Sequence, residues 1–143
     1  MRLTSFTDYG LRMLMRMASA PDLAFSTTEL ADEFGLSRHH LTKIMQRLAR
    51  GGIVSTRRGG GGGAVLSRAP DAIRLGEVVR LLEEGQALVE CLGPAAGACT
   101  IEGSCRLKAR LRWAERSFLA DLNRSTLADI ALAPSSVPAR ASI

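Results

Sequence analysis

Aromatic residues are scarce, at 4% of the 143 residues, although 46% of the residues are hydrophobic. A core of this composition must consist mainly of Leu, Ile, Val, Met and Ala side chains. Long apolar runs are also missing, which excludes a transmembrane helix. Asp8, Arg12 and Arg16 interrupt the apolar residues near the amino terminus, so no signal peptide is predicted. These absences predict a cytoplasmic chain of single-domain size with no membrane partner.

Cysteines number only three, and an odd count without an export signal argues against a disulfide framework. Cys91, Cys99 and Cys105 follow the pattern C-x7-C-x5-C in or at the end of a stretch rich in glycine. Loop thiolates at such spacing can converge on an iron–sulfur cluster. Zinc sites usually show C-x2–4-C pairs and four ligands, so zinc is a weaker alternative. A redox thiol sensor and inert cysteines also remain open, and any cluster needs a fourth ligand from elsewhere.

Positive charge is concentrated in the first half of the chain. Residues 1–74 carry 11 Lys or Arg against 6 Asp or Glu, whereas residues 75–143 carry 8 of each. Within residues 38–74 the imbalance reaches 8 basic residues against 1 acidic residue, Asp71. Such a basic block is typical of a nucleic-acid-binding surface, and a solvated surface without a partner is the alternative.

Hydrophobic spacing predicts several helices and a hairpin in the first part of the chain. Thr27 is the expected N-cap of the second helix, and Gly35 permits a tight turn before Ser37 caps the third. Residues 53–56 and 64–66 are the expected strands of the hairpin, with glycines at its tip. The expected helices cover residues 6–19, 27–34, 38–50 and about 74–84.

Two helices joined by a tight turn and followed by a basic hairpin are typical of a winged helix-turn-helix domain. The third helix has one apolar stripe for the core, and its polar face can enter the major groove of DNA. The alternative for this face is a solvated surface. The predicted DNA-contacting residues are Arg38, His39, His40, Thr42 and Lys43 on the helix and Arg57 and Arg58 on the wing.

Other chemistries find little support in these segments. A phosphate-binding loop would need Gly-Lys-Ser/Thr after the glycine run, but Gly63 is followed by Ala-Val-Leu. His39 and His40 are adjacent on a helix and cannot both face one metal ion. No nucleophile–base pair or carboxylate dyad is visible, so the chain is not predicted to be an enzyme.

A long helix is predicted over about residues 106–123. Its apolar stripe exceeds what a small winged domain must cover, which predicts a homodimer, with packing inside one chain as the alternative. A two-fold dimer also suits a palindromic DNA site. The stripe consists of Leu107, Leu111, Ala114, Phe118 and Leu122.

The expected fold class is therefore mainly α, a winged helix-turn-helix domain with a two-stranded β wing and a long C-terminal dimerisation helix. Its organisation is a DNA-binding domain over 1–84 and a cysteine loop over 85–105. The dimerisation helix and a short terminal helix follow over 106–132. A tail over 133–143, rich in Pro, Ser and Ala, is expected to be disordered.

Several segments of the chain resemble the iron–sulfur winged-helix repressors, a family whose branches include NsrR, IscR and RirA. The resemblance runs from Met1 to about Leu132, and its opening and C-R-L-K segments are most similar to the nitric-oxide-sensing NsrR branch. In the IscR branch a histidine three residues after the last cysteine is a cluster ligand. This chain has Lys108 there, which argues against that branch. The resemblance is carried by MRLTSFTDYGLRML, LADEFGLSRHHLTKIMQRLARGGIVSTRRG, AIRLGEVVRLLE, the three cysteines and CRLKARLRWAERSFLADLNRSTLADI.

The resemblance implies a homodimeric transcriptional repressor that releases a palindromic DNA operator when nitric oxide nitrosylates its iron–sulfur cluster. Cys91, Cys99 and Cys105 would hold the cluster, and Asp8 from the partner subunit would be the fourth ligand. This ligand set favours 4Fe–4S over 2Fe–2S. Arg12 would pair with Asp8, although Asp8 could simply complement the dipole of its helix. An iron-responsive or thiol-redox-responsive regulator on the same scaffold is the alternative function.

Overall fold

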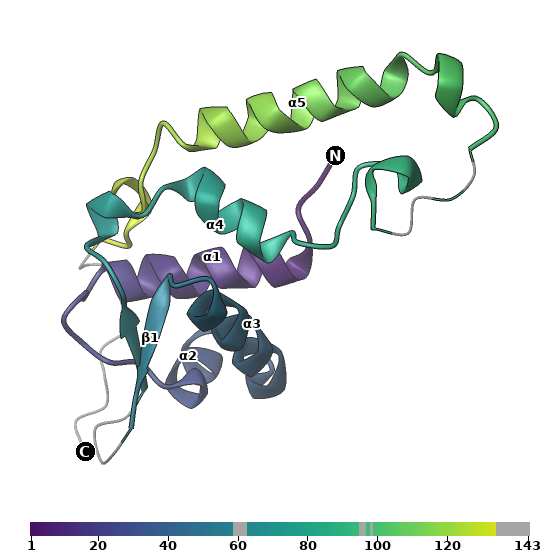
Figure 1. Ribbon diagram of the computed structural model, residues 1–143. Coiled ribbons are helices and arrows are strands. Elements are labelled where there is room, and N and C mark those ends of the chain that lie inside the picture. Colours follow the sequence, from purple (N-terminus) through teal and green to yellow (C-terminus); the bar gives the residue numbers. More distant parts are fainter. Residues whose placement is uncertain (59–62, 95–96, 98, 134–143) are drawn as a thin grey trace.

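The computed structural model describes residues 1–58, 63–94, 97 and 99–133 (Figure 1). The predicted wing tip at residues 59–62 and the predicted tail beyond Ala133 lie outside this part of the chain. The longer elements are α1 (Ser5–Ala18), α2 (Thr27–Phe34), α3 (Arg38–Arg50), β1 (Val54–Arg57), β2 (Gly63–Leu66), α4 (Leu75–Leu82) and α5 (Leu107–Leu122). Single 3₁₀ turns are η1 (Pro70–Ala72), η2 (Glu90–Leu92), η3 (Glu102–Ser104) and η4 (Leu127–Ile130).

The predicted mainly α, winged-helix fold is confirmed, with differences in detail. Each helix begins and ends within two residues of its predicted limits. The N-cap of α2 is Ser26 rather than Thr27, because Ser26 and Glu29 form a reciprocal capping box. The predicted cysteine loop over 85–105 contains the 3₁₀ turns η2 and η3.

Apolar side chains from the first four helices and the wing form one core. Met13 and Leu14 of α1 are fully buried, as are Leu41 and Ile44 of α3 and Val78 of α4. Burying a side chain of this size contributes roughly 2 kcal/mol. Helix α3 is therefore anchored by its apolar stripe, and its other face is left for solvent or a ligand.

Phe25 connects the wing to the helices, although the sequence alone did not predict that it pairs with the sheet. β1 and β2 pair antiparallel from Val54↔Leu66 to Arg57↔Gly63. The amide of Phe25 donates to Ala64 O at 2.9 Å, and the amide of Ala64 donates to Phe25 O at 2.8 Å. A Cβ atom at Gly63 would lie 2.7 Å from the carbonyl oxygen of Phe25, so only glycine fits there. This third segment supports a hairpin that would be marginal alone.

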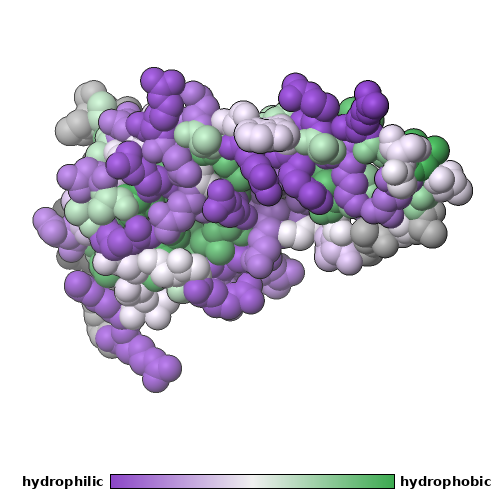
Figure 2. Space-filling model, turned by 45° about the horizontal axis from the view of Figure 1, so that its top comes forward, coloured by the Kyte–Doolittle hydropathy of each residue, from purple (hydrophilic) through white to green (hydrophobic). Residues whose placement is uncertain are grey.

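The carboxyl-terminal half of α5 lies along α4, and its amino-terminal half extends over the cysteine loop (Figure 1). A Cβ atom at Gly76 would overlap the carbonyl oxygen of Leu119, which shows how closely the two helices approach. No residue of α5 is buried, and Leu107 and Trp113 are 61% and 62% exposed. Hydrophilic side chains cover much of this side of the molecule, with smaller hydrophobic patches between them (Figure 2). No helix in the described ranges is long and apolar enough to span a membrane.

Candidate nucleic-acid interface and cysteine loop

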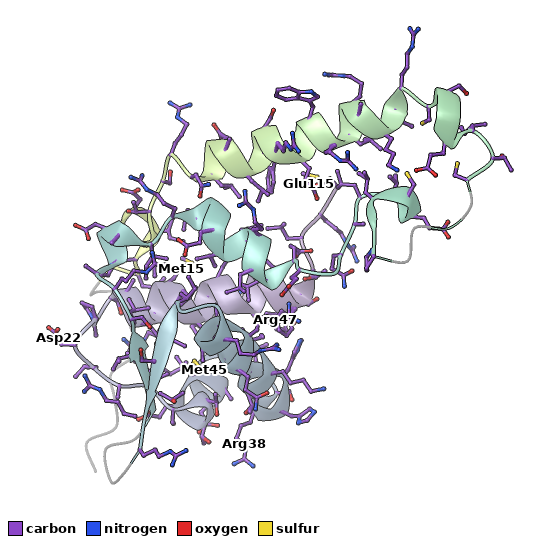
Figure 3. All side chains as sticks on the ribbon, viewed as in Figure 1. Met15, Asp22, Arg38, Met45, Arg47 and Glu115 are labelled. Atoms are coloured by element: carbon purple, nitrogen blue, oxygen red, sulfur yellow. The ribbon has the colours of Figure 1, made fainter. Side chains whose placement is uncertain are left out.

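The turn between α2 and α3 sets the direction of the candidate recognition helix. Gly35 has a φ of 64°, a left-handed conformation that glycine adopts without steric cost. Ser37 then caps α3 by accepting a hydrogen bond from the amide of His40. Arg38 extends outward from the start of α3, whereas Met45 lies within the fold (Figure 3). This turn and cap therefore leave the first turns of α3 exposed on the surface of the protein.

The predicted contact residues of α3 differ in their surroundings. Arg38, His39 and Lys43 are exposed. Thr42 is half-buried, and its hydroxyl donates to the carbonyl oxygen of Arg38 at 2.9 Å. His40 is also half-buried, and its ring faces Phe6 and Tyr9 of α1 rather than open solvent.

The structure divides the basic block into paired and unpaired residues. Arg47 lies 3.7 Å from Glu84, Arg68 lies 2.6 Å from Glu77, and Arg74 donates to the carbonyl oxygen of Asn123. Within the described ranges, no ion pair involves the remaining cations of residues 38–58, all of them exposed. These are Arg38, Lys43, Arg50, Arg57 and Arg58.

Gln46 and Arg50 are missing from the predicted contact set, although both are exposed on α3. They continue the helical spacing that begins with His39 and Lys43, so that four residues share one face. This spacing could have identified them from the sequence. The unpaired cations on and beside this face and on the wing suit a phosphate backbone.

Asp8 and Arg12 form an ion pair on the exposed side of α1. Arg12 Nη2 lies 2.8 Å from Asp8 Oδ2, and Arg12 Nε lies 3.1 Å from Asp8 Oδ1. Both side chains are about half exposed, at 50% and 49%. The arginine therefore holds the carboxylate in a defined place on the surface of α1.

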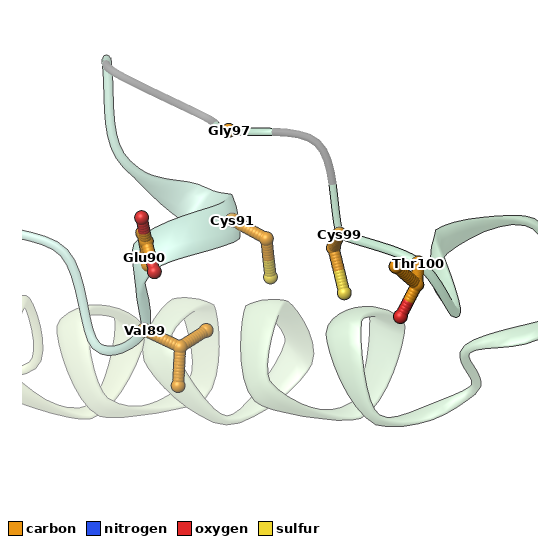
Figure 4. A pocket seen from close by; sticks show the side chains of 6 residues that line it. All are labelled: Val89, Glu90, Cys91, Gly97, Cys99 and Thr100. Atoms are coloured by element: carbon orange, nitrogen blue, oxygen red, sulfur yellow. The ribbon is translucent and has the colours of Figure 1, made fainter.

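Cys91 and Cys99 line one pocket of about 440 Å³, together with Glu90 and Thr100. Their side chains point to the same side of the loop, toward α5 (Figure 4). Cys105 stands just before α5 and is not part of the pocket lining, and all three thiols are free. No three metal-binding side chains are assembled around one point in the described ranges. The donor set nevertheless has the chemistry of an iron–sulfur site, because three unpaired thiols share one short loop.

Lys108 places a positive charge beside the cysteine loop. Its Nζ donates to Glu102 Oε1 at 2.5 Å. This hydrogen bond raises the pKa of Lys108 and lowers the pKa of Glu102, and the charge of Cys91 also raises the pKa of Lys108. Lys108 thus lies close enough to Cys91 for the two side chains to interact electrostatically.

Solved structures with this fold include several proteins described as regulators. The chain is 28% identical to CymR (YrzC), the global cysteine regulator of B. subtilis, with a TM-score of 0.68 over 92% of this chain and 96% of that one. IscR of T. potens is 24% identical, with a TM-score of 0.68 over 91% of this chain and 85% of that one. The oxidized form of Staphylococcus aureus CymR is 24% identical, with a TM-score of 0.69 over 93% and 98%. The last two likenesses show the fold alone.

The family comparison covers nearly all of the described residues. The model of the Rrf2 family, described as an iron-dependent transcriptional regulator, matches residues 3–133. This range contains α3, the wing, the cysteine loop and α5. The chain therefore belongs to the Rrf2 family of DNA-binding transcriptional regulators.

Proposed function

We propose that this protein is a homodimeric repressor that binds a palindromic DNA operator and senses nitric oxide through an iron–sulfur cluster. The observation that carries the proposal is the cysteine loop, which presents three free thiols, two of them in one pocket, beside the DNA-binding half. Cys91, Cys99 and Cys105 would hold the cluster, with Asp8 from the partner subunit as the fourth ligand. A 4Fe–4S form is favoured because Asp8 stands at the position of the carboxylate ligand in the resembling NsrR branch. When bound, the cluster supplies the iron with which nitric oxide reacts.

The protein's own part in the response begins with DNA contact. His39, Thr42 and Lys43 can meet base edges or phosphates in the major groove, because they lie in the first turns of α3. Arg38 adds a further cation there. Arg57 and Arg58 are exposed at the end of β1, where a wing reaches the sugar–phosphate backbone.

Dimerisation would place two such surfaces on one operator. In the single chain Leu107 and Ala114 of the α5 stripe are exposed and its other three members are only half-buried, so part of the stripe is open to a second copy. A two-fold dimer would set the spacing of two α3 helices to the spacing of two half-sites. Release of Asp8 would free α1 of one protomer from the loop of its partner, and the two helices would no longer match the operator.

Anaerobic native mass spectrometry and a gel shift test this proposal together. We expect a dimer carrying two 4Fe–4S masses that binds a palindromic duplex selected from a random library. Stoichiometric nitric oxide should then weaken binding to that duplex. Unchanged affinity after nitric oxide would reject nitric-oxide sensing, even if the cluster is present.

A thiol-responsive regulator is the second candidate, and two observations favour it. Cys99 is exposed and shares a pocket with Cys91, so the thiols are open to an oxidant. The 28% identity with a global cysteine regulator also fits this sensor. Two results together would support a thiol-responsive regulator. The dimer would stay metal-free after anaerobic purification and attempted reconstitution, and hydrogen peroxide would change its affinity for the selected duplex. Loss of the cluster under iron limitation alone would instead support an iron-responsive regulator.

A further inference from the structure

The contacts of His40 point to a role other than base recognition. We propose that His40 is a positioning residue that joins the first turn of α3 to the Asp8 turn of α1. Through this contact, a change at Asp8 would alter how α3 lies on DNA. The inference rests on the proposed function for the release of Asp8 from the cluster. The path from Asp8 to α3 rests on the described contacts.

The ring of His40 is held by two aromatic rings of α1. Its centroid lies 5.4 Å from that of Tyr9, with the planes at 77°, and 6.0 Å from that of Phe6, with the planes at 47°. Edge-to-face and tilted arrangements at these distances are favourable contacts between rings. Phe6 and Tyr9 lie one turn apart on α1, so His40 packs onto one short segment of that helix.

The same segment of α1 carries Asp8 and Arg12. Arg12 binds both carboxylate oxygens of Asp8, and its guanidinium carbon lies 5.5 Å from the centroid of the Tyr9 ring. Asp8, Arg12, Tyr9 and His40 therefore form an unbroken chain of contacts from α1 to α3. A new partner for Asp8 would compete with Arg12, and Arg12 would then leave its position over Tyr9.

The far end of α3 is held by α4 and the core in addition to Phe6, the ring that it shares with His40. Arg47 donates to the carbonyl oxygen of Leu81 at 3.3 Å, and its guanidinium carbon lies 5.4 Å from the centroid of the Phe6 ring. Leu48 is fully buried. Because this end is held by α4 and the core, a shift of Tyr9 would act mainly on the first turn, next to His39 and Lys43.

Contacts in a row do not by themselves establish coupling, so the test must measure coupling. The readout is the ratio of affinities for the selected palindromic duplex before and after stoichiometric nitric oxide. We expect a ratio of roughly 5- to 150-fold for the unaltered protein. His40→Ala should bring the ratio close to one with unchanged cluster absorbance. His40→Phe should keep the ratio, since a ring without hydrogen-bonding groups still packs on α1.

His39→Ala is the matched control, because His39 is the exposed neighbour on the same turn. It should lower both affinities by the same factor and leave the ratio intact. Tyr9→Leu is a second variant that removes the contact from α1, and it should act like His40→Ala. A ratio that His40→Ala and Tyr9→Leu leave unchanged would overturn this inference alone. A ratio of one in the unaltered protein would overturn the proposed function and the inference with it.

Discussion

Two arginines of α1, one turn apart, show how burial affects the contribution of an ion pair to the stability of the fold. Arg12 and Asp8 are half exposed, whereas the side chain of Arg16 is 3% exposed and lies 2.8 Å from Glu33. The guanidinium of Arg16 also lies 4.8 Å from the centroid of the Phe25 ring. A buried charge is tolerated only when it is paired, so the Arg16–Glu33 pair belongs to the scaffold.

Glu33→Ala should therefore destabilise the protein strongly. Removing the carboxylate leaves the Arg16 charge buried without an anionic partner, and we expect a loss of about 3 kcal/mol in the free energy of unfolding. Urea denaturation measures it. Glu77→Ala breaks the exposed pair with Arg68 and should cost no more than about 1 kcal/mol. Equal losses in the two variants would contradict the view that burial sets the difference.

Lys43→Ala should weaken binding to the selected palindromic duplex without altering cluster absorbance. Lys43 is exposed and unpaired in the described part of the chain. Its loss should remove one phosphate contact, and the slope of log affinity against log salt concentration should then fall by about one. Arg58→Ala should behave similarly from the wing. Arg68→Ala is the control, because Arg68 belongs to the same basic block but is paired with Glu77. Gel shifts at several salt concentrations measure these effects. If Arg68→Ala weakened DNA binding as much as Lys43→Ala, the assignment of Lys43 as a phosphate contact would be refuted.

At the scale of elements, α4 and α5 approach each other closely. Gly76 lies against the carbonyl oxygen of Leu119, and the side chain of Asn123 accepts a hydrogen bond from the amide of Glu77. Gly76→Ala should push α5 away and cost about 1–3 kcal/mol in the free energy of unfolding. Gly103→Ala is the matched control, because no atom lies within 4 Å of the added methyl group. Thermal unfolding and hydrogen exchange of α5 would show the difference, and identical results would argue against this close contact.

The cysteine loop should be separable from the scaffold. Cys99 is exposed, and no cysteine belongs to the hydrophobic core. Cys99→Ala should remove the absorbance of the proposed cluster and leave the proposed dimer folded, as circular dichroism and light scattering would show. Unfolding of this variant would mean that the loop is structural and that sensor and scaffold are not independent.

At the scale of the whole molecule, the apolar stripe of α5 should govern assembly. Leu111→Glu places a charge on that stripe and should produce monomers that bind a single half-site weakly. Ala109→Glu adds the same charge to the other side of α5 and should leave the dimer intact. Sedimentation velocity distinguishes the two outcomes. Dimers in both variants would place the interface elsewhere on the molecule.

Local signals predicted most of the architecture. Apolar residues three and four apart predicted α1, α3 and α5 within one or two residues, because helical periodicity acts within a few turns. Gly35 and Ser37 predicted the turn before α3 for the same reason, since turn and cap preferences involve neighbouring residues. The predicted N-cap of α2 was one residue too late, because Ser26 and Thr27 are adjacent and both residue types can cap a helix.

The candidate site depends more on distant partners. Counting charges identified the basic block, but Arg47 and Arg74 are bound by groups 34 and 49 residues away. The pattern on α3 grouped His40 with the exposed residues, and only the packing of α1 against α3 shows its aromatic contacts. The cysteine pattern predicted the loop, whereas the fold determined that Cys91 and Cys99 share a pocket and that Cys105 stands apart.

The sequence by itself determined the helices, the tight turn and the wing, and it predicted the residues proposed to contact DNA or to hold a cluster. Each of these follows from interactions along a short stretch of chain. Only the tertiary structure decided which cations remain unpaired, where Phe25 supports the wing and how His40 meets α1. These features depend on side chains far apart in sequence, and such pairs become neighbours only when the core brings their elements together.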